Sequence, residues 1–137
     1  MSERPLHVPG FRFGGWRCGI KPSGGMDLGL ILADRPVPAA AVFTQNQIFA
    51  APVAASRAAI QGGRAQAVIV NSGNANACTG AAGVEATQRT VAQLAGALGC
   101  AKEHIQVAST GVIGVPLPVE KITCLLYTSP SPRDRPL

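Results

Sequence analysis

Ser109, Thr110 and Gly111 follow one another directly after a short apolar run, and their types could support acyl-transfer chemistry. If residues 105–109 form a strand that breaks at Thr-Gly, a hydroxyl and an unpaired backbone N–H lie together at the end of a sheet. Two such donors make an oxyanion hole, since glycine permits close approach and the threonine hydroxyl can donate to a developing alkoxide. The spacing alone is also that of an ordinary turn.

A second polar segment, residues 71–80, is rich in asparagine and lies where open α/β sheets bind ligands. Its glycines are spaced wrongly for a dinucleotide fingerprint or a P-loop, and no lysine lies nearby to reach a phosphate. Asparagine side chains satisfy turn backbones and cap helices. We therefore expect Asn71, Asn74 and Asn76 to be structural, and keep a nucleotide-binding α/β module as an alternative.

Cys78 precedes an expected helix, and a helix N-terminus favours a nucleophilic thiolate. The sequence places neither His7 nor His104 beside it as a base, so we expect a buried, inert cysteine. The cysteines as a set show no C-x-x-C spacing and no paired histidines, which gives a zinc site or a redox dithiol no support. We expect no metal and no tightly bound cofactor.

The pattern around these segments predicts an α/β unit. The β-branched run 67–71 predicts a central strand, residues 81–98 a helix and residues 105–109 a second strand. We expect the two strands to be parallel with a right-handed crossover. Glu85 and Arg89 are spaced for an i,i+4 ion pair on the helix. The apolar face expected for this helix consists of Val84, Val91, Leu94, Ala95 and Leu98.

The first half of the chain is less regular. Residues 1–25 are rich in glycine and proline, which predicts a loop with short extended pieces. The apolar runs 26–33 and 39–44 predict two strands. Residues 52–60 predict a short helix with Pro52 in its first turn.

The 137 residues carry 12 basic and 7 acidic side chains, 47% hydrophobic residues and 4% aromatic residues, which is the balance of one globular domain. The scattered positive charge and scarce aromatic residues argue against nucleic-acid binding. No long apolar run and no leader pattern occur, so we expect a soluble, cytoplasmic protein without membrane contact.

The last residues differ in character from the rest. The run CLLYTSPSPRD, which begins at Cys124, resembles the conceptual translation of a sequencing-library adapter and shows no helical or strand period. We expect residues 1–123 to be the biological part and residues 124–137 to be a non-native tail. A natural Pro/Ser-rich tail is the alternative.

Two longer motifs, VNSGNANACTG and ASTGVIGVPLP, strongly resemble the ornithine acetyltransferase/glutamate N-acetyltransferase family of arginine biosynthesis. The segments GIKPSGGMDLGLI, AAVFTQN and AAPV match the family in the same order, so the resemblance covers about residues 8–123. It implies an α/β fold of layered sheets and helices, of the type shared with self-cleaving aminopeptidases. This chain would hold only an incomplete N-terminal part of the family's α chain.

The resemblance also implies a reaction. Family members are precursors that cut themselves between an Ala and a Thr, and the freed Thr carries acetyl from N2-acetylornithine to L-glutamate. Bifunctional members also accept acetyl-CoA as a co-substrate. By motif match the oxyanion hole is the hydroxyl of Thr110 and the N–H of Gly111, held by Ser109 and Val112.

The family's nucleophile lies beyond the matched motifs, on the β chain of the same precursor. The resemblance therefore implies that this chain is inactive alone and acts in a hetero-oligomer of α and β chains. The pair Ala86-Thr87 lies within the expected helix and lacks the family's cleavage context. An aminopeptidase of the related self-cleaving fold, which would use the same oxyanion hole for a peptide carbonyl, is a further alternative.

Overall fold

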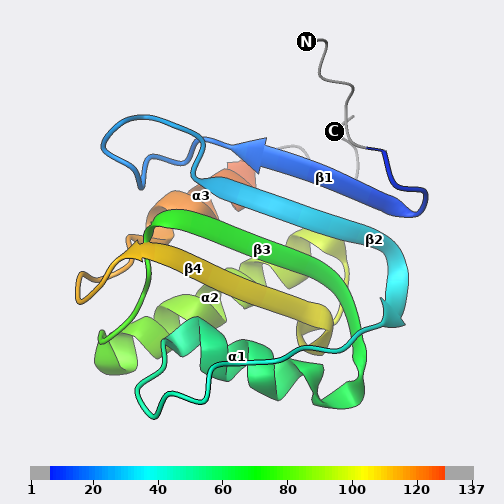
Figure 1. Cartoon of the computed structure of the whole chain (residues 1–137). Helices are drawn as coiled ribbons and strands as arrows, with labels where there is room; N and C mark the ends of the chain where they lie inside the picture. Colours follow the sequence, from blue (N-terminus) through cyan, green and yellow to red (C-terminus); the bar gives the residue numbers. More distant parts are fainter. Residues whose placement is uncertain (1–6, 129–137) are drawn as a thin grey trace, which may run out of the picture.

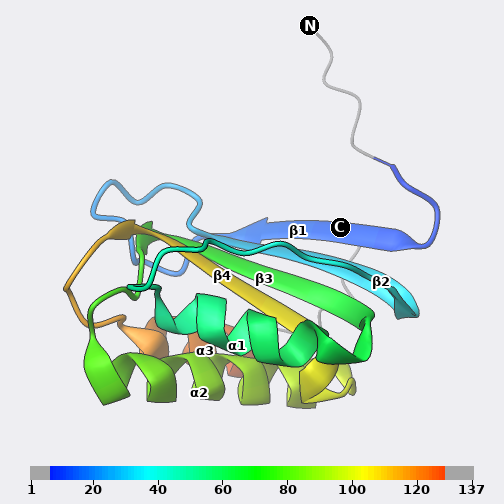
Figure 2. The same cartoon turned by 60° about the horizontal axis from the view of Figure 1, so that its bottom comes forward.

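The structure is a computed structural model that describes residues 7–128. Its strands form one sheet in the order β1-β2-β3-β4, with the first two pairings antiparallel and β3 parallel to β4. The helices lie together on one face of the sheet (Figures 1 and 2). The elements are β1 (Phe11–Trp16), β2 (Leu28–Pro38), α1 (Ala51–Ala59), β3 (Arg64–Asn74), α2 (Gly80–Leu98), β4 (Ile105–Val112) and α3 (Val119–Thr128).

The predicted strand, helix and strand of the second half are confirmed as β3, α2 and β4, and the two strands are parallel. Both strands are longer than predicted. In particular, β4 continues through Thr110 and Gly111 to Val112, so the predicted break at Thr-Gly is wrong. The ladder persists because Gly111 has no Cβ, which would overlap the backbone of Gly73 and Asn74 in β3, so the two strands can approach closely.

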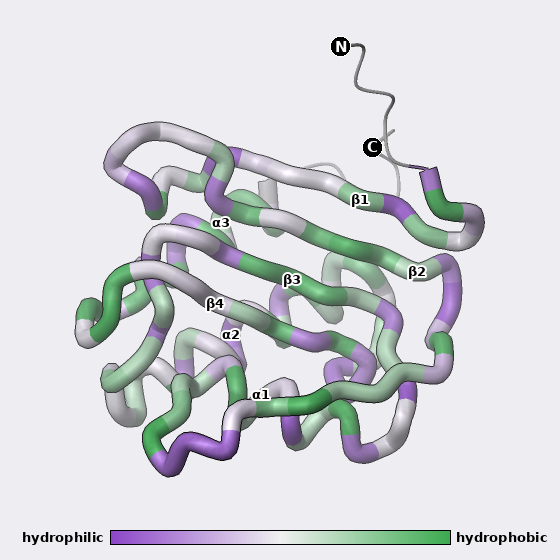
Figure 3. The backbone as a smooth tube through the Cα atoms, in the orientation of Figure 1, coloured by the Kyte–Doolittle hydropathy of each residue, from purple (hydrophilic) through white to green (hydrophobic). Residues whose placement is uncertain are grey.

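The core lies between the sheet and the helices. Apolar residues of β2, β3 and β4 fill the covered face, and Figure 3 shows the hydrophobic middle of β2 and β3. Leu94 and Leu98 of α2 are 0% and 1% exposed against this face. Burying a leucine side chain contributes about 2 kcal/mol, so this contact fixes α2 across β3 and β4. Among the described residues, no helix is long and apolar enough to cross a bilayer.

The predicted strand 39–44 is wrong. Pro38 pairs with Arg64, the first residue of β3, so residues after Pro38 have no further partner in that strand. The chain leaves the sheet there and runs as an irregular segment towards α1. Val42 is 98% exposed, so it has no sheet face to cover. The preceding prediction, residues 26–33, is confirmed within β2, and the predicted helix 52–60 is confirmed as α1.

The buried face of α2 differs from the apolar stripe that was predicted. Val84 is 47% exposed, whereas Thr87 and Thr90 are 2% and 3% exposed. Their hydroxyls donate to the carbonyl groups of Gly83 and Ala86 one turn earlier, at 3.0 and 2.9 Å. Because the helix itself satisfies these hydroxyls, threonine can be buried where the pattern called for an aliphatic residue.

The helix α3 crosses the predicted boundary between residues 123 and 124. Ile122 and Leu126 lie four residues apart and are 1% and 8% exposed, so the expectation of no helical period after Cys124 is wrong. The non-native origin of residues 124–137 stays a prediction, and residues 129–137 lie outside the described part.

The predicted ion pair between Glu85 and Arg89 within α2 does not form. Arg89 pairs with Glu120 of α3 at 3.4 Å, not with Glu85. Both side chains are well exposed, so the pair links α3 to α2 but contributes little stability.

Candidate functional site

The carboxyl ends of β3 and β4 bring the predicted site residues together. Ser72 pairs with Thr110, and Gly73 pairs with Gly111. Gly73 and Gly111 both have positive φ angles, of 101° and 134°. A Cβ on Gly111 would overlap the backbone of Gly73 and Asn74, so this position admits only glycine.

The backbone of β4 turns the N–H of Gly111 away from the sheet. The N–H and carbonyl of Val107 bond the Ser56 hydroxyl of α1, outside the sheet, whereas the Val112 carbonyl accepts from the N–H of Ala75 next to β3. Successive residues of a strand direct their backbone groups to opposite sides. Gly111 shares its side with Val107, so its N–H points to the free outer edge of β4.

The side chain of Thr110 lies on the face of the sheet that the helices leave uncovered. The neighbouring Ser109 points to the covered face, where its hydroxyl donates to the Asn71 side chain at 2.5 Å. Side chains alternate between faces along a strand, and Thr110 is exposed. The Thr110 hydroxyl and the Gly111 N–H therefore belong to consecutive residues and are both directed away from the core. Their role as an oxyanion hole stays a prediction.

The asparagines of segment 71–80 hold this end of the sheet, which confirms their predicted structural role. The Asn71 amide donates to the carbonyl of Asn74 at 2.9 Å. The Asn74 amide in turn donates to the carbonyl groups of Val115 and Pro116, at 3.0 and 3.2 Å. These bonds join the ends of β3 and β4 to the loop that follows β4.

Asn76 connects the same segment to α2. It is fully buried, and its amide donates to the Gly83 carbonyl and the Thr87 hydroxyl, both at 2.9 Å. Its side-chain oxygen accepts from the Thr79 hydroxyl at 2.9 Å. Asn76 thus binds a carbonyl and a hydroxyl within α2 and not the free N–H groups at its start. Thr79, the residue directly before α2, makes no side-chain cap bond either, so the predicted capping of α2 is wrong.

Cys78 is exposed, which corrects the prediction of a buried cysteine. Its φ angle of 57° turns the side chain out of the segment before α2. His104 directly precedes β4, at the end opposite Thr110, and His7 precedes β1, so the structure brings neither to Cys78 or to the site. Within residues 7–128, no group of three or more His, Cys, Asp or Glu residues could hold a metal ion.

Sequence reasoning missed Asp27, which is 3% exposed at the start of β2. Its carboxylate accepts backbone N–H bonds of 2.7–3.1 Å from four consecutive residues, Cys18, Gly19, Ile20 and Lys21. Burial disfavours the charged carboxylate, but these bonds outweigh it and lower the pKa of Asp27 to about 2. The available signal was a lone acidic residue between a glycine-rich loop and an apolar strand.

The thiol of Cys18 responds to the same carboxylate. Burial of the thiol, its hydrogen bond to Asp27 and the negative charge of Asp27 raise the pKa of Cys18 to about 11. This cysteine is therefore protonated at neutral pH and unsuited to act as a nucleophile.

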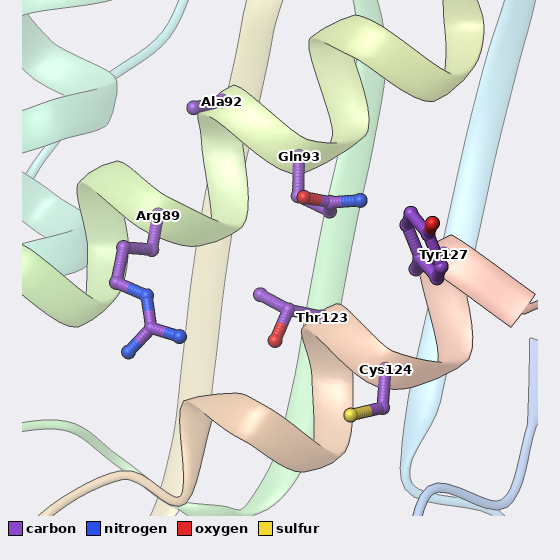
Figure 4. A pocket seen from close by; sticks show the side chains of 6 residues that line it. All are labelled: Arg89, Ala92, Gln93, Thr123, Cys124 and Tyr127. Atoms are coloured by element: carbon purple, nitrogen blue, oxygen red, sulfur yellow. The ribbon is translucent and has the colours of Figure 1, made fainter.

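The surface has a hollow that borders the candidate site and another that is separate from it. One of about 270 Å³ lies beside β4 and is lined by Phe43, Ala50, Pro52, Val53, Ser56, Val68, Gln106, Val107, Ala108 and Ser109. It therefore borders the Thr110 end of the strand. The other, of about 460 Å³, lies between α2 and α3 (Figure 4). None of its lining residues belongs to β3 or β4, so it is separate from the site.

The model of the ArgJ family matches residues 12–130, most of the chain. This chain belongs to the ArgJ family. The arginine biosynthesis bifunctional protein ArgJ of Gloeobacter violaceus is 57% identical over 114 residues, which cover 82% of this chain and 28% of that protein. ArgJ of Geobacter sulfurreducens is 47% identical over 117 residues, which cover 85% and 30%.

Solved ArgJ structures share the fold. The crystal structure of ArgJ from Bacillus halodurans superposes with a TM-score of 0.83 at 38% identity, over 90% of this chain and 65% of that chain. Ornithine acetyltransferase from Mycobacterium tuberculosis, in complex with ornithine, gives 0.82 at 44% identity, over 86% and 64%. The predicted family and α/β fold are confirmed. The chain spans less than a third of the length of these curated ArgJ relatives.

Proposed function

We propose that this chain supplies the oxyanion-binding part of an ArgJ acetyltransferase of arginine biosynthesis, acting in the cytoplasm on N2-acetylornithine and L-glutamate. Membership of the ArgJ family supports the reaction class. The observation that carries the proposal is the pair of open donors at the end of β4, the Thr110 hydroxyl and the Gly111 N–H.

In this reaction a threonine hydroxyl, supplied by the β chain, attacks the acetyl carbonyl carbon of N2-acetylornithine. The carbonyl oxygen becomes an oxyanion, which Thr110 and Gly111 stabilise by donating hydrogen bonds. Cleavage of the C–N bond, with protonation of the leaving amine, releases ornithine and leaves an acetyl-Thr ester. The amine of glutamate then attacks the ester through a second oxyanion, which yields N-acetylglutamate and restores the threonine hydroxyl.

The proposal has three further parts. The chain alone is inactive, because the nucleophile belongs to the β chain. Acetyl-CoA can replace acetylornithine as donor, since a thioester passes through the same oxyanion. No metal or tightly bound cofactor takes part.

The test uses a chimera in which residues 8–118 of this chain replace the matching part of the Gloeobacter violaceus ArgJ. We expect acetyl transfer from acetylornithine to glutamate, measured as ornithine release. Thr110→Ala lowers kcat about 100-fold, the scale of one lost oxyanion donor. Thr110→Ser keeps a hydroxyl and serves as the matched control.

Equal rates in the Thr110→Ala and unsubstituted chimeras would refute the role of Thr110. The same preparations separate the alternatives. Peptide hydrolysis without acetyl transfer would favour the aminopeptidase, and saturable nucleotide binding by the chain alone would favour the nucleotide-binding module.

A further inference from the structure

Loop 18–21, whose backbone N–H groups donate to the Asp27 carboxylate, lies directly against the candidate site. A Cβ placed on Gly73 would come within 3.0 Å of the side chains of both Ile20 and Lys21, so this loop is in tight contact with the end of β3. Gly73 is in turn the register partner of Gly111. The loop therefore contacts Gly73, the residue of β3 against which the backbone of Gly111 packs.

Asp27 also reaches the site through its own backbone. Its carbonyl accepts from the N–H of Ser72 at 2.9 Å, and Ser72 is the register partner of Thr110. One residue thus contacts the loop through its carboxylate and the end of β3 through its carbonyl. The loop has a second anchor, since the Lys121 ammonium donates to the Gly19 carbonyl at 2.7 Å, but this bond is exposed and open to water.

We propose that Asp27 is a positioning residue for the oxyanion hole: its buried carboxylate holds loop 18–21 against Gly73, and thereby holds Gly111 in the backbone conformation that turns its N–H to the free edge of β4. The proposal rests on the function proposed above. Asp27 acts through the loop and the strand end, and its carboxylate accepts from the backbone N–H groups of residues 18–21.

The first test needs no activity and uses this chain as it stands. Asp27→Asn keeps the shape of the side chain but replaces one carboxylate oxygen by an NH2 group. An NH2 group cannot accept hydrogen bonds from the backbone N–H groups of the loop. We expect backbone amide exchange at residues 18–21 to rise at least about 10-fold, with altered NMR shifts at Gly73 and Gly111. Asp34→Asn is the matched control, because Asp34 is an exposed acid of β2, the strand that follows Asp27. We expect it to leave these signals unchanged.

A folded Asp27→Asn variant with unaltered Gly73 and Gly111 signals would overturn the proposal. If that variant does not fold, Ile20→Ala takes its place, since it removes the Ile20 part of the contact between the loop and Gly73 and keeps the carboxylate. The same shifts at Gly111 are then expected, and their absence has the same consequence.

The second test measures catalysis in the chimera. We expect Asp27→Asn to lower kcat about 10-fold while KM stays within about twofold, because the oxyanion donors act in the transition state and not on bound substrate. An unchanged kcat would overturn the proposal. A chimera that transfers no acetyl group even without substitution would instead refute the proposed function, and the NMR result would still report on Asp27.

Discussion

Gly73 and Gly111 face each other across β3 and β4 so closely that Gly111 has no room for a side chain. A methyl group on Gly111 would overlap the Gly73 backbone, and the φ angle of 134° is itself strained for any other residue. We therefore expect Gly111→Ala to lower the free energy of unfolding by about 3 kcal/mol, measured by urea denaturation.

Gly114→Ala is the control for the dihedral angle alone. Gly114 also has a positive φ, of 80°, but a Cβ there meets nothing within 4 Å. The expected loss is about 1 kcal/mol. Equal losses at both positions would show that the close approach of β3 and β4 is not what restricts Gly111.

Two glycines of α2 offer a matched pair with opposite outcomes. A Cβ on Gly83 would overlap the Thr79 hydroxyl and come within 2.7 Å of the buried Asn76 oxygen, so Gly83→Ala destabilises by about 2 kcal/mol. A Cβ on Gly96 meets nothing within 4 Å, so Gly96→Ala stabilises by about 0.8 kcal/mol through helix propensity. Thermal unfolding of the two variants checks both signs, and a stabilised Gly83→Ala would contradict the packing around Asn76.

The Asp27 carboxylate makes stability depend on pH at the acidic end. Its pKa falls from 3.8 to about 2 on folding, so its contribution is fully present above about pH 3.8 and is lost as the pH drops through about 2. This contribution is roughly 2 kcal/mol. Urea denaturation over this range should show the unsubstituted chain approaching Asp27→Asn as the pH falls. A constant gap between the two would contradict the effect.

The cysteines should differ in reactivity towards iodoacetamide at pH 8. Cys18 is half-buried and has a pKa of about 11, whereas Cys78 is exposed. We expect Cys78 to be alkylated at least about 10-fold faster, measured by mass spectrometry of the peptides. Asp27→Asn removes the bond and charge that help to raise the Cys18 pKa, so it should speed alkylation of Cys18 and leave Cys78 unchanged.

The parts of the fold that were predictable are those with a strong local pattern. The β-branched run at 67–71 and the helix that ends at Gly99 identified β3 and α2 because burial and glycine stops are encoded locally. The prediction of a strand at 39–44 failed because a strand also needs a partner, and β3 begins only at Arg64, opposite Pro38, so it has no residue left to pair with this run. Partners are set by tertiary structure, which a local pattern does not contain.

The residues of the candidate site also divide into those that the sequence predicts and those that it does not. Thr110 and Gly111 were predicted from their types and from a motif, and the structure adds their place at the end of β4, opposite Ser72 and Gly73. Asp27 was missed because its partners are backbone N–H groups, which every sequence has and no motif marks. The pairing of Arg89 with Glu120 was missed because α3 was not expected to pack there.

The parallel pairing of β3 with β4 also sets an order of folding. Asn71 and Ser109, which are hydrogen-bonded across the two strands, are separated by 38 residues, and the whole of α2 lies between them. A loop of that length must close before Gly111 can align with Gly73, whereas the antiparallel pairing of β2 with β3 can begin at Pro38 and Arg64, which are only 26 residues apart. We therefore expect the end of the sheet that carries Thr110 and Gly111 to be among the last regions to form, and variants that slow the docking of α2 should delay its formation before they affect the rest of the domain.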